Sequence, residues 1–309
     1  AFVIGGELSL GELVAFSNYI FMLIWPMRMM GWLTNVLAQC LASVKKIDKI
    51  FTEEPEITNP PNPFTPEVLS GHVEFKKVSF TIGDACILKD VSINAKKGST
   101  IAVMGITGAG KSSLINLIGR YYDCTSGEVC IDGVNVKNMS LDVLRKNVAV
   151  VMQDVFLFSD TIEENIRFGL DITSTDPAFI YAAKDSMVDE FVCQMSEGYN
   201  TVIGERGIGL SGGQKQRISI ARALVRDAKV LILDDSTSAL DMETEYHIQK
   251  ALNKRTDITR FIIAHRISAV KNADEILYFD NGSIVERGTH DELLALGGKY
   301  YKTYCAQYS

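Results

Sequence analysis

The sequence predicts an α/β body that follows one long apolar helix, and three observations support this prediction. Residues 13–44 contain a single charged residue, Arg28, and five of the seven prolines lie between Pro55 and Pro66. Beyond them, short apolar runs are separated by longer polar stretches, as expected for buried strands that alternate with helices. The chain of 309 residues therefore has an apolar head, a proline-rich segment and a mixed body.

The apolar head is predicted to cross a membrane. Residues 13–33 would form a helix of roughly 31 Å, which matches the roughly 30 Å hydrocarbon core of a bilayer. Arg28 is expected to face a bundle interior or a watery cavity. Lys45, Lys46 and Lys49 follow the span, so the positive-inside bias places the rest of the chain in the cytoplasm. The alternatives are a buried core helix and a signal peptide, for which the apolar run is too long.

These patterns divide the chain into three parts. Residues 1–53 are assigned to the end of a membrane domain, with a cytoplasmic extension of the helix, and residues 54–70 to a linker. The body, residues 71–309, contains two hairpin turns, Asp132-Gly133 and Asn281-Gly282. It opens with two alternating segments that indicate antiparallel strands, His72–Phe75 and Lys77–Phe80.

Four apolar runs in the body are predicted to be strands of a mainly parallel core sheet, buried on both faces. Residues from about 155 to 228 contain no such run and are predicted to form a helical insertion. The body therefore combines a parallel sheet, an antiparallel β subdomain and an α-helical insertion. The four runs are Thr100–Met104, Val148–Met152, Val230–Leu233 and Phe261–Ala264.

Composition excludes several classes of protein. The net charge of −7 and the pI near 5.3 argue against a nucleic-acid partner, because phosphate binding needs a surplus of Lys and Arg. A hydrophobic content of 47% excludes a disordered chain. The six cysteines show neither paired CxxC spacing nor a metal-ligand pattern, and we assign them no function.

Residues 105–112, Gly-Ile-Thr-Gly-Ala-Gly-Lys-Ser, fit the P-loop pattern G-x-x-x-x-G-K-[ST] between a predicted strand and a predicted helix. Glycines let backbone N–H groups turn toward phosphate oxygens at a helix N-terminus. Lys111 is expected to reach the outer phosphates and Ser112 to bind Mg²⁺. The predicted nucleotide contacts are Gly105, Ile106, Thr107, Gly108, Ala109, Gly110, Lys111, Ser112 and Ser113.

Two acidic residues end the apolar run Val230–Leu233. A carboxylate at this strand end is where the Mg²⁺ partner of a P-loop belongs, so Asp234 is predicted to bind the metal. Asp235 is then positioned to orient or deprotonate an attacking water. The alternative for such a pair alone is a solvated turn.

A further glycine pair precedes the helix predicted over Lys215–Val225. Ser211 can cap this helix, and Gly212 and Gly213 allow an anion to approach its N-terminus, with Gln214 beside them. The alternative is an ordinary capped helix start. We expect the exposed helix start to need an anion from elsewhere.

Together these residues resemble the ATP-binding cassette (ABC) ATPases over residues 71–309. Leu210–Gln214 (LSGGQ) is similar to the family signature and Gln153 to the Q-loop glutamine, a further Mg²⁺ ligand and catalytic residue. Residues 238–241 resemble the D-loop, and His265 the catalytic switch histidine. Glu205, just before the signature, is typical of exporters.

The resemblance implies a P-loop NTPase of ABC type that binds ATP and Mg²⁺. It implies a multidrug-type exporter half-transporter in the cell membrane, multi-pass in full length, with the ATPase domain in the cytoplasm. Two such cassettes, identical or different, would pair head to tail, with each ATP between the P-loop of one and the signature of the other. Membrane lipid is a further partner, and the transported substrate, whether drug, lipid or peptide, is not readable.

Two positions depart from the family pattern. Asp235 replaces the usual Glu and is one methylene shorter, roughly 1.5 Å, which suggests a slow site and a heterodimer with an intact partner. Ile82 replaces an aromatic residue expected to stack on adenine, so stacking is either lost or supplied by a neighbour such as Phe80. The alternatives are a regulatory subunit that binds ATP with little turnover and a soluble ABC ATPase.

Overall fold

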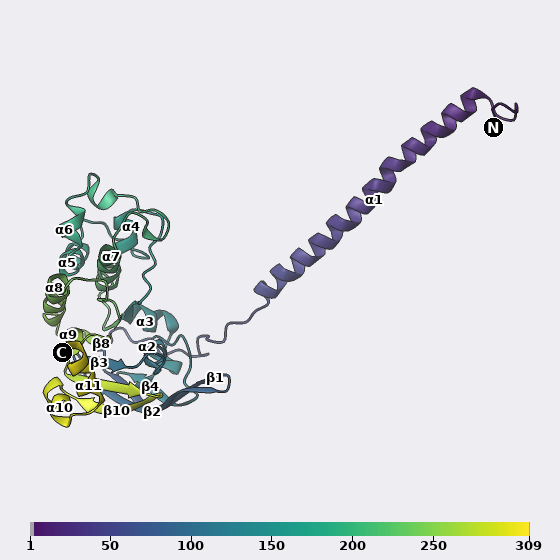
Figure 1. Ribbon diagram of the computed structural model, residues 1–309. Coiled ribbons are helices and arrows are strands. Elements are labelled where there is room, and N and C mark those ends of the chain that lie inside the picture. The colour runs from purple at the N-terminus through teal and green to yellow at the C-terminus, as the bar shows by residue number, and fades with distance from the viewer. Residues whose placement is uncertain (1–2, 309) are drawn as a thin grey trace. The chain divides into compact units, whose positions relative to one another are not determined.

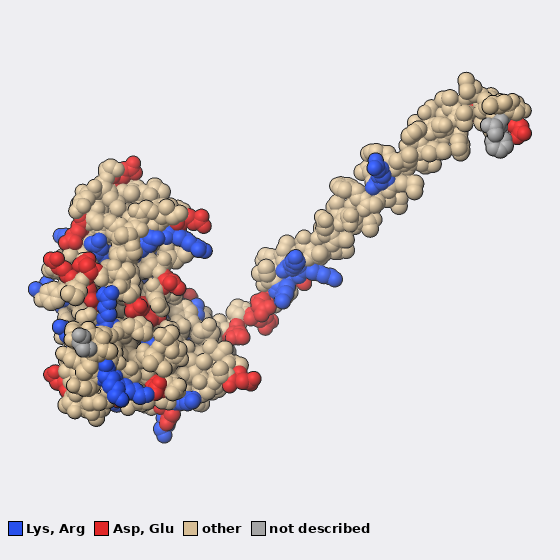
Figure 2. Space-filling model, viewed as in Figure 1, with Lys and Arg blue, Asp and Glu red and all other residues tan. Residues whose placement is uncertain are grey.

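The computed structural model describes residues 3–308, and its contacts divide the chain between Glu56 and Ile57. The first unit is a long helix and the second is an α/β body (Figure 1). On the face shown in Figure 2, acidic and basic side chains are interspersed over the body, whereas the helix displays mainly uncharged ones. Each unit is described by itself.

Helix α1 (Leu10–Phe51, 42 residues) forms the first unit. Ser9 and Glu12 form a capping box at its start, because each side chain accepts a hydrogen bond from the backbone N–H of the other residue. Pro26 lies inside the helix, and none of the helical residues is buried. Of the helices described, α1 is the one long and apolar enough to cross a bilayer. An apolar surface of this size requires a cover of lipid or protein.

The first sheet of the body is antiparallel, in the order β2-β1-β4-β5. Asp132 and Gly133, with φ of 52° and 78°, form the tight turn between β4 and β5, as predicted. The prediction for the start of the body was wrong in one respect. Both alternating segments belong to one strand, β1, which is irregular around Lys77 (φ 48°), and its partner β2 was not predicted. The strands are β1 (Val73–Ile82), β2 (Ala85–Ala95), β4 (Ser126–Ile131) and β5 (Val134–Asn135).

The second sheet confirms the mainly parallel core, in the order β10-β9-β3-β8-β7-β6. All neighbours are parallel except β9 and β10, which the Asn281-Gly282 turn connects. Each predicted apolar run is a strand within two residues at either end. The strands are β3 (Thr100–Gly105), β6 (Val148–Val151), β7 (Val230–Asp234), β8 (Thr259–Ile263), β9 (Glu275–Asp280) and β10 (Ser283–Gly288).

Helices cover both sheets and fill the connection from β6 to β7, where the helical insertion was predicted. The insertion comprises α4 (Ile162–Ile166), α5 (Pro177–Asp185), α6 (Val188–Val192) and α7 (Gly212–Leu224), with 3₁₀ turns at Gly198–Asn200 and Glu205–Gly207. The other helices are α2 (Lys111–Ile118), α3 (Leu141–Asn147), α8 (Met242–Asn253), α9 (Ile267–Val270), α10 (His290–Leu296) and α11 (Lys299–Tyr308), with a 3₁₀ turn at Val136–Asn138.

Three apolar clusters hold the body together. The first joins the two sheets and α2, the second joins the helical insertion to the core sheet, and the third joins β9 to α9, α10 and α11. The proline-rich segment also contacts the body, because Phe64 forms a parallel bridge with Met139 and the Asn59 side chain accepts from the Leu141 N–H (2.8 Å).

Candidate nucleotide-binding site

The carboxyl ends of four parallel strands bring together residues that are far apart in the sequence. Strand β3 ends at Gly105 and β7 at Asp234, while β8 and β6 end two residues before His265 and Gln153. Ligands of open α/β sheets bind at this edge. A pocket of about 320 Å³ lies there, lined by Ile87, Thr107, Gly108, Gly110, Lys111, Ser112, Ser113, Gln153, Asp234, Asp235, Ile263 and His265.

The loop from β3 to α2 has the backbone of an anion site. Gly110, the N-cap of α2, has a φ of 95° and leaves the helix start without a side-chain cap. Within residues 107–113, only the Ala109 N–H donates to another described residue, the Ile106 carbonyl (3.3 Å). The other amides are therefore available to phosphate oxygens.

Two glycines of this loop are required by close packing. A Cβ on Gly105 would lie 2.2 Å from the Phe279 carbonyl oxygen of β9, and one on Gly110 would lie 2.8 Å from that of Ile87. Around Gly108, in contrast, the space is open. Of the predicted contacts outside the pocket lining, Ala109 is buried and Ile106 is exposed.

Lys111 is held on its own loop. Its Nζ donates to the carbonyl oxygens of Gly105 (2.9 Å) and Ile106 (2.8 Å). Burial lowers the pKa of Lys111, and the carboxylates of Asp234 and Asp235 oppose this effect. Two neutral acceptors thus bind a buried ammonium, and a charged phosphate would be a stronger acceptor.

Ser112 and Asp234 supply oxygen ligands of the kind that Mg²⁺ prefers. Asp234 is 9% exposed, and it lines the pocket together with Ser112. Burial raises the pKa of Asp234, while Ser112, Lys111 and His265 lower it. A hydroxyl and a carboxylate beside the phosphate loop fit Mg²⁺, which takes few protein ligands and keeps water and phosphate oxygens.

The three residues predicted to be catalytic all line this pocket. Asp235 follows β7 with a φ of 45°, its N–H donates to the Ile263 carbonyl (2.9 Å), and its own carbonyl accepts from the Ser238 hydroxyl (2.8 Å). His265 reaches the pocket after β8, and Gln153 after β6. Their roles in hydrolysis stay predictions.

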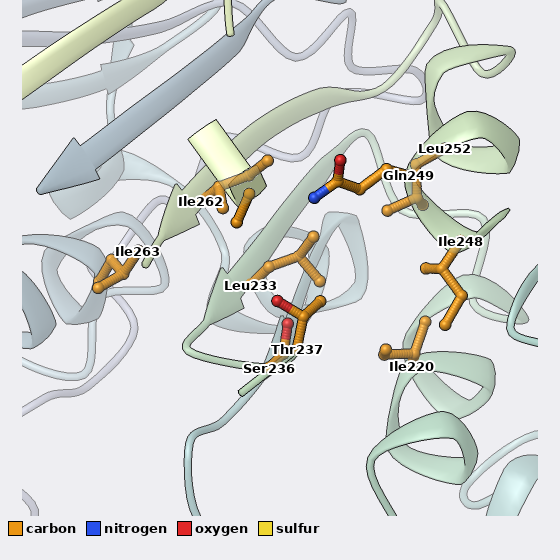
Figure 3. A pocket seen from close by; sticks show the side chains of 10 residues that line it. Ile220, Leu233, Ser236, Thr237, Ile248, Gln249, Leu252, Ile262 and Ile263 are labelled. Carbon is orange, nitrogen blue, oxygen red and sulfur yellow. The ribbon is translucent and has the colours of Figure 1, made fainter. Parts of the chain in front are cut away.

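A second cavity behind this edge is too small for a nucleotide. It has a volume of about 20 Å³, room for roughly one water, and apolar side chains of β7, β8, α7 and α8 form most of its wall (Figure 3). Ser236 also lines it, and its buried hydroxyl has no hydrogen-bond partner among the described residues.

Comparisons with known proteins agree on one family. The family model described as "ABC transporter" matches residues 88–238. Two proteins of Bacillus subtilis (strain 168) align over 309 residues, which are 99% of this chain and 53% of each relative. They are "Uncharacterized ABC transporter ATP-binding protein YknU", 45% identical, and "Putative multidrug export ATP-binding/permease protein YgaD", 44% identical.

A solved structure supports the same assignment. "Structure of a bacterial Atm1-family ABC exporter with ATP bound" is 35% identical, with a TM-score of 0.83 over 98% of this chain and 53% of that one. The chain carries the nucleotide-binding domain of an ABC transporter. It spans about half the length of the curated relatives it matches.

The ABC signature lies outside the pocket of its own chain. Ser211 caps α7, as predicted, because its hydroxyl accepts from the Gln214 N–H (3.2 Å) while Gln214 Oε1 accepts from the Ser211 N–H (2.8 Å). The helix begins at Gly212, three residues earlier than expected. The capping box satisfies the Gln214 amide, and the binding of an anion at this helix start stays a prediction. The Gly212 and Gly213 amides donate to no other described residue.

The position predicted to stack on adenine carries an aliphatic side chain. Ile82, which replaces the expected aromatic residue, is 52% exposed at the end of β1, and Ile87 of β2 lines the pocket. Phe80 is 4% exposed and packs against the Tyr122 ring, with the ring centroids 5.5 Å apart. Phe80 is therefore in the core and cannot supply the stacking face.

Sequence reasoning missed two side chains of α7 that connect distant segments, and the buried Gln216 is the first. Its Nε2 donates to the Ser238 hydroxyl (3.2 Å), and its Oε1 accepts from the Ala239 N–H (3.0 Å). It therefore fixes the D-loop to the signature helix. In the sequence, only the position of Gln216 two residues after Gln214 of the signature could have indicated this role.

Arg222 is the second. It donates to the carbonyl oxygens of Asn165 (2.7 Å) and Phe156 (2.9 Å), and it lies 5.8 Å from the Phe158 ring centroid and 5.9 Å from that of Phe168. Burial lowers the pKa of Arg222 to about 10. This arginine joins the signature helix to the exposed aromatic segment that follows Gln153.

Proposed function

We propose that this chain is part of an exporter subunit that binds and hydrolyses ATP to drive transport across a membrane. The observation that carries the proposal is the convergence of Lys111, Ser112, Gln153, Asp234 and His265 at one sheet edge. Free amides, an ammonium and a hydroxyl–carboxylate pair are the groups that a nucleotide triphosphate and its metal require.

Each group has a defined task in the conversion of ATP and water to ADP and phosphate. Lys111 leaves its loop carbonyls and binds the outer phosphates together with the amides of residues 107–113. Ser112, Asp234 and Gln153 would hold Mg²⁺, which supplies charge neutralisation on the phosphate oxygens. Asp235 and His265 orient the attacking water, and Asp235 accepts its proton.

The signature points to a partner cassette, because Ser211 and the free amides of Gly212 and Gly213 line no nucleotide pocket of their own chain. We infer a head-to-tail pair in which they contact the phosphates bound by the partner's P-loop. The short Asp235 carboxylate favours a heterodimer, whose other subunit provides the faster site.

Helix α1 is proposed to cross the membrane over residues 13–33 and to continue into the cytoplasm. Its exposed apolar circumference supports a lipid or protein environment, and Lys45, Lys46 and Lys49 support a cytoplasmic end. The whole protein, whose relatives are about twice as long, would then be multi-pass.

A second candidate function is a regulatory subunit that binds ATP and leaves turnover to its partner. Asp235 is the observation in its favour. The two functions differ in one measurement, the rate at which the site of this chain hydrolyses ATP.

The test uses the full-length protein, with any subunit that co-purifies, in lipid vesicles. We expect MgATP hydrolysis by the site of this chain that stops in Lys111→Ala, and ATP-dependent movement of a fluorescent lipid or drug into the vesicles. MgATP binding without any hydrolysis by this site would favour the regulatory function. Absence of MgATP binding would contradict both functions.

A further inference from the structure

One side chain fastens the segment that carries His265 to α11. Gln307 donates from Nε2 to the His265 carbonyl oxygen (2.6 Å) and accepts at Oε1 from the Ile267 N–H (2.9 Å). Only one orientation of the carboxamide satisfies both contacts, because its nitrogen donates and its oxygen accepts. The two bonds therefore hold the peptide groups on both sides of Arg266.

The side chain of Arg266 extends these contacts to the D-loop. Arg266 has an extended backbone, with φ −94° and ψ 133°, and its guanidinium donates to the carbonyl oxygens of Ser238 (2.8 Å) and Leu240 (3.4 Å). The Ser238 hydroxyl in turn donates to the Asp235 carbonyl (2.8 Å). A chain of contacts thus runs from Gln307 to the backbone of Asp235.

Helix α11 is itself anchored to the sheet that carries the site. Tyr300 is fully buried and its hydroxyl bonds to His290 Nδ1 (2.6 Å), while Thr303 bonds to the hydroxyl of Tyr278 on β9 (3.1 Å). Strand β9 pairs with β3, the strand that leads into the P-loop. The position of Gln307 is therefore fixed relative to the phosphate-binding loop.

We propose that Gln307 is a positioning residue for ATP hydrolysis. By holding the peptide groups around Arg266, it sets the position of His265 in the pocket and of the D-loop against Asp235. This inference rests on the proposed ATPase function. Two partly exposed hydrogen bonds add little stability, but a displacement of about 1 Å at reacting groups can cost on the order of 100-fold in rate.

The experiment compares three variants of the full-length transporter, each in the natural and the Asp235→Glu background, so that turnover at this site is measurable. Gln307→Ala removes both bonds. Gln307→Glu keeps the acceptor for the Ile267 N–H but sets a carboxylate against the His265 carbonyl. Lys302→Ala, an exposed change on the same helix, is the control.

We expect kcat to fall about tenfold in Gln307→Ala and at least as much in Gln307→Glu. KM for MgATP should stay within about twofold and Tm should be unchanged, as for Lys302→Ala. An unchanged kcat in Gln307→Ala, an equal loss in Lys302→Ala, or a loss of kcat that follows a lowered Tm would overturn the inference. A natural protein that neither binds nor hydrolyses MgATP would instead overturn the proposed function.

Discussion

The two glycine-rich helix starts of the ABC domain satisfy their first amides in different ways. At α2, Gly110 provides no cap and the amides of residues 107–113 other than Ala109 are free, with Lys111 at the first turn. At α7, Ser211 and Gln214 form a complete capping box. The first helix start offers free amides to an anion within one chain, whereas the second is already capped, and we propose that it gains a further contact from a phosphate bound by a partner.

Lysine substitutions give the largest expected contrast between these helix starts. Lys111→Ala removes the ammonium from the P-loop and should lower ATP hydrolysis at the site of this chain by on the order of 100-fold to 1000-fold. Lys215 is the matched residue in the first turn of α7, and its Nζ donates to the Arg206 carbonyl (3.0 Å). Lys215→Ala should change turnover less than about twofold. Equal losses for the two variants in single-turnover assays of this site would contradict the predicted difference between the helix starts.

Asp235→Glu tests whether ATP hydrolysis at the P-loop of this chain is slow because the Asp235 carboxylate is short. The added methylene restores roughly 1.5 Å of reach, so hydrolysis at this site should rise about tenfold or more. Asp291→Glu, the same change in the first turn of α10, should leave the rate unchanged. If the rate of Asp235→Glu equals that of the natural protein in single-turnover assays, the slow-site hypothesis is wrong.

Substitutions of two capping residues test whether the signature acts in the proposed dimer as well as in the stability of its helix. Ser211→Ala and Thr289→Ala each remove one capping box, that of α7 and that of α10, and each should cost about 1 kcal/mol of stability. Only Ser211→Ala should also lower hydrolysis by the assembled pair, about tenfold. Chemical denaturation and ATPase assays measure the two effects, and an equal ATPase loss in Thr289→Ala would refute a dimer role for Ser211.

The smallest expected effect concerns the base. With Ile82 and Ile87 in place of an aromatic face, the dissociation constants for ATP and GTP should agree within about threefold. Ile82→Tyr should tighten ATP binding about fivefold, which corresponds to about 1 kcal/mol of stacking. Equilibrium titration with both nucleotides checks this, and a strong adenine preference in the natural protein would contradict it.

Local sequence patterns predicted much of the fold and the outline of the site. The P-loop, the acidic pair at Asp234 and the strands of the core sheet are contiguous segments with their own periodicity or glycine spacing, and parallel strands necessarily align their carboxyl ends. The convergence of these residues at one pocket therefore follows from topology. The cap at Ser211 was predictable for the same reason, since its partner is three residues away.

Contacts between distant segments could not be predicted in this way. The hydrogen bond from Gln307 to His265 joins residues 42 positions apart in the sequence, and the bond from Arg222 to Asn165 joins residues 57 apart. No local sequence pattern indicates these contacts. Strand β2 was missed because Lys89 and Asp90 interrupt its apolar alternation, and its burial depends on the register with β1. Phe80 was predicted as a possible stacking residue for adenine because the sequence does not show which face of β1 is buried.

Pro26 has a consequence for how α1 sits among other helices. Proline has no N–H, so the Met22 carbonyl, one turn earlier, lacks its helical donor, and no side chain of the described residues replaces it. An unpaired carbonyl in hydrocarbon costs several kcal/mol. If α1 spans a bilayer, the side that carries the Met22 carbonyl should therefore face another helix or water, which orients the helix about its own axis.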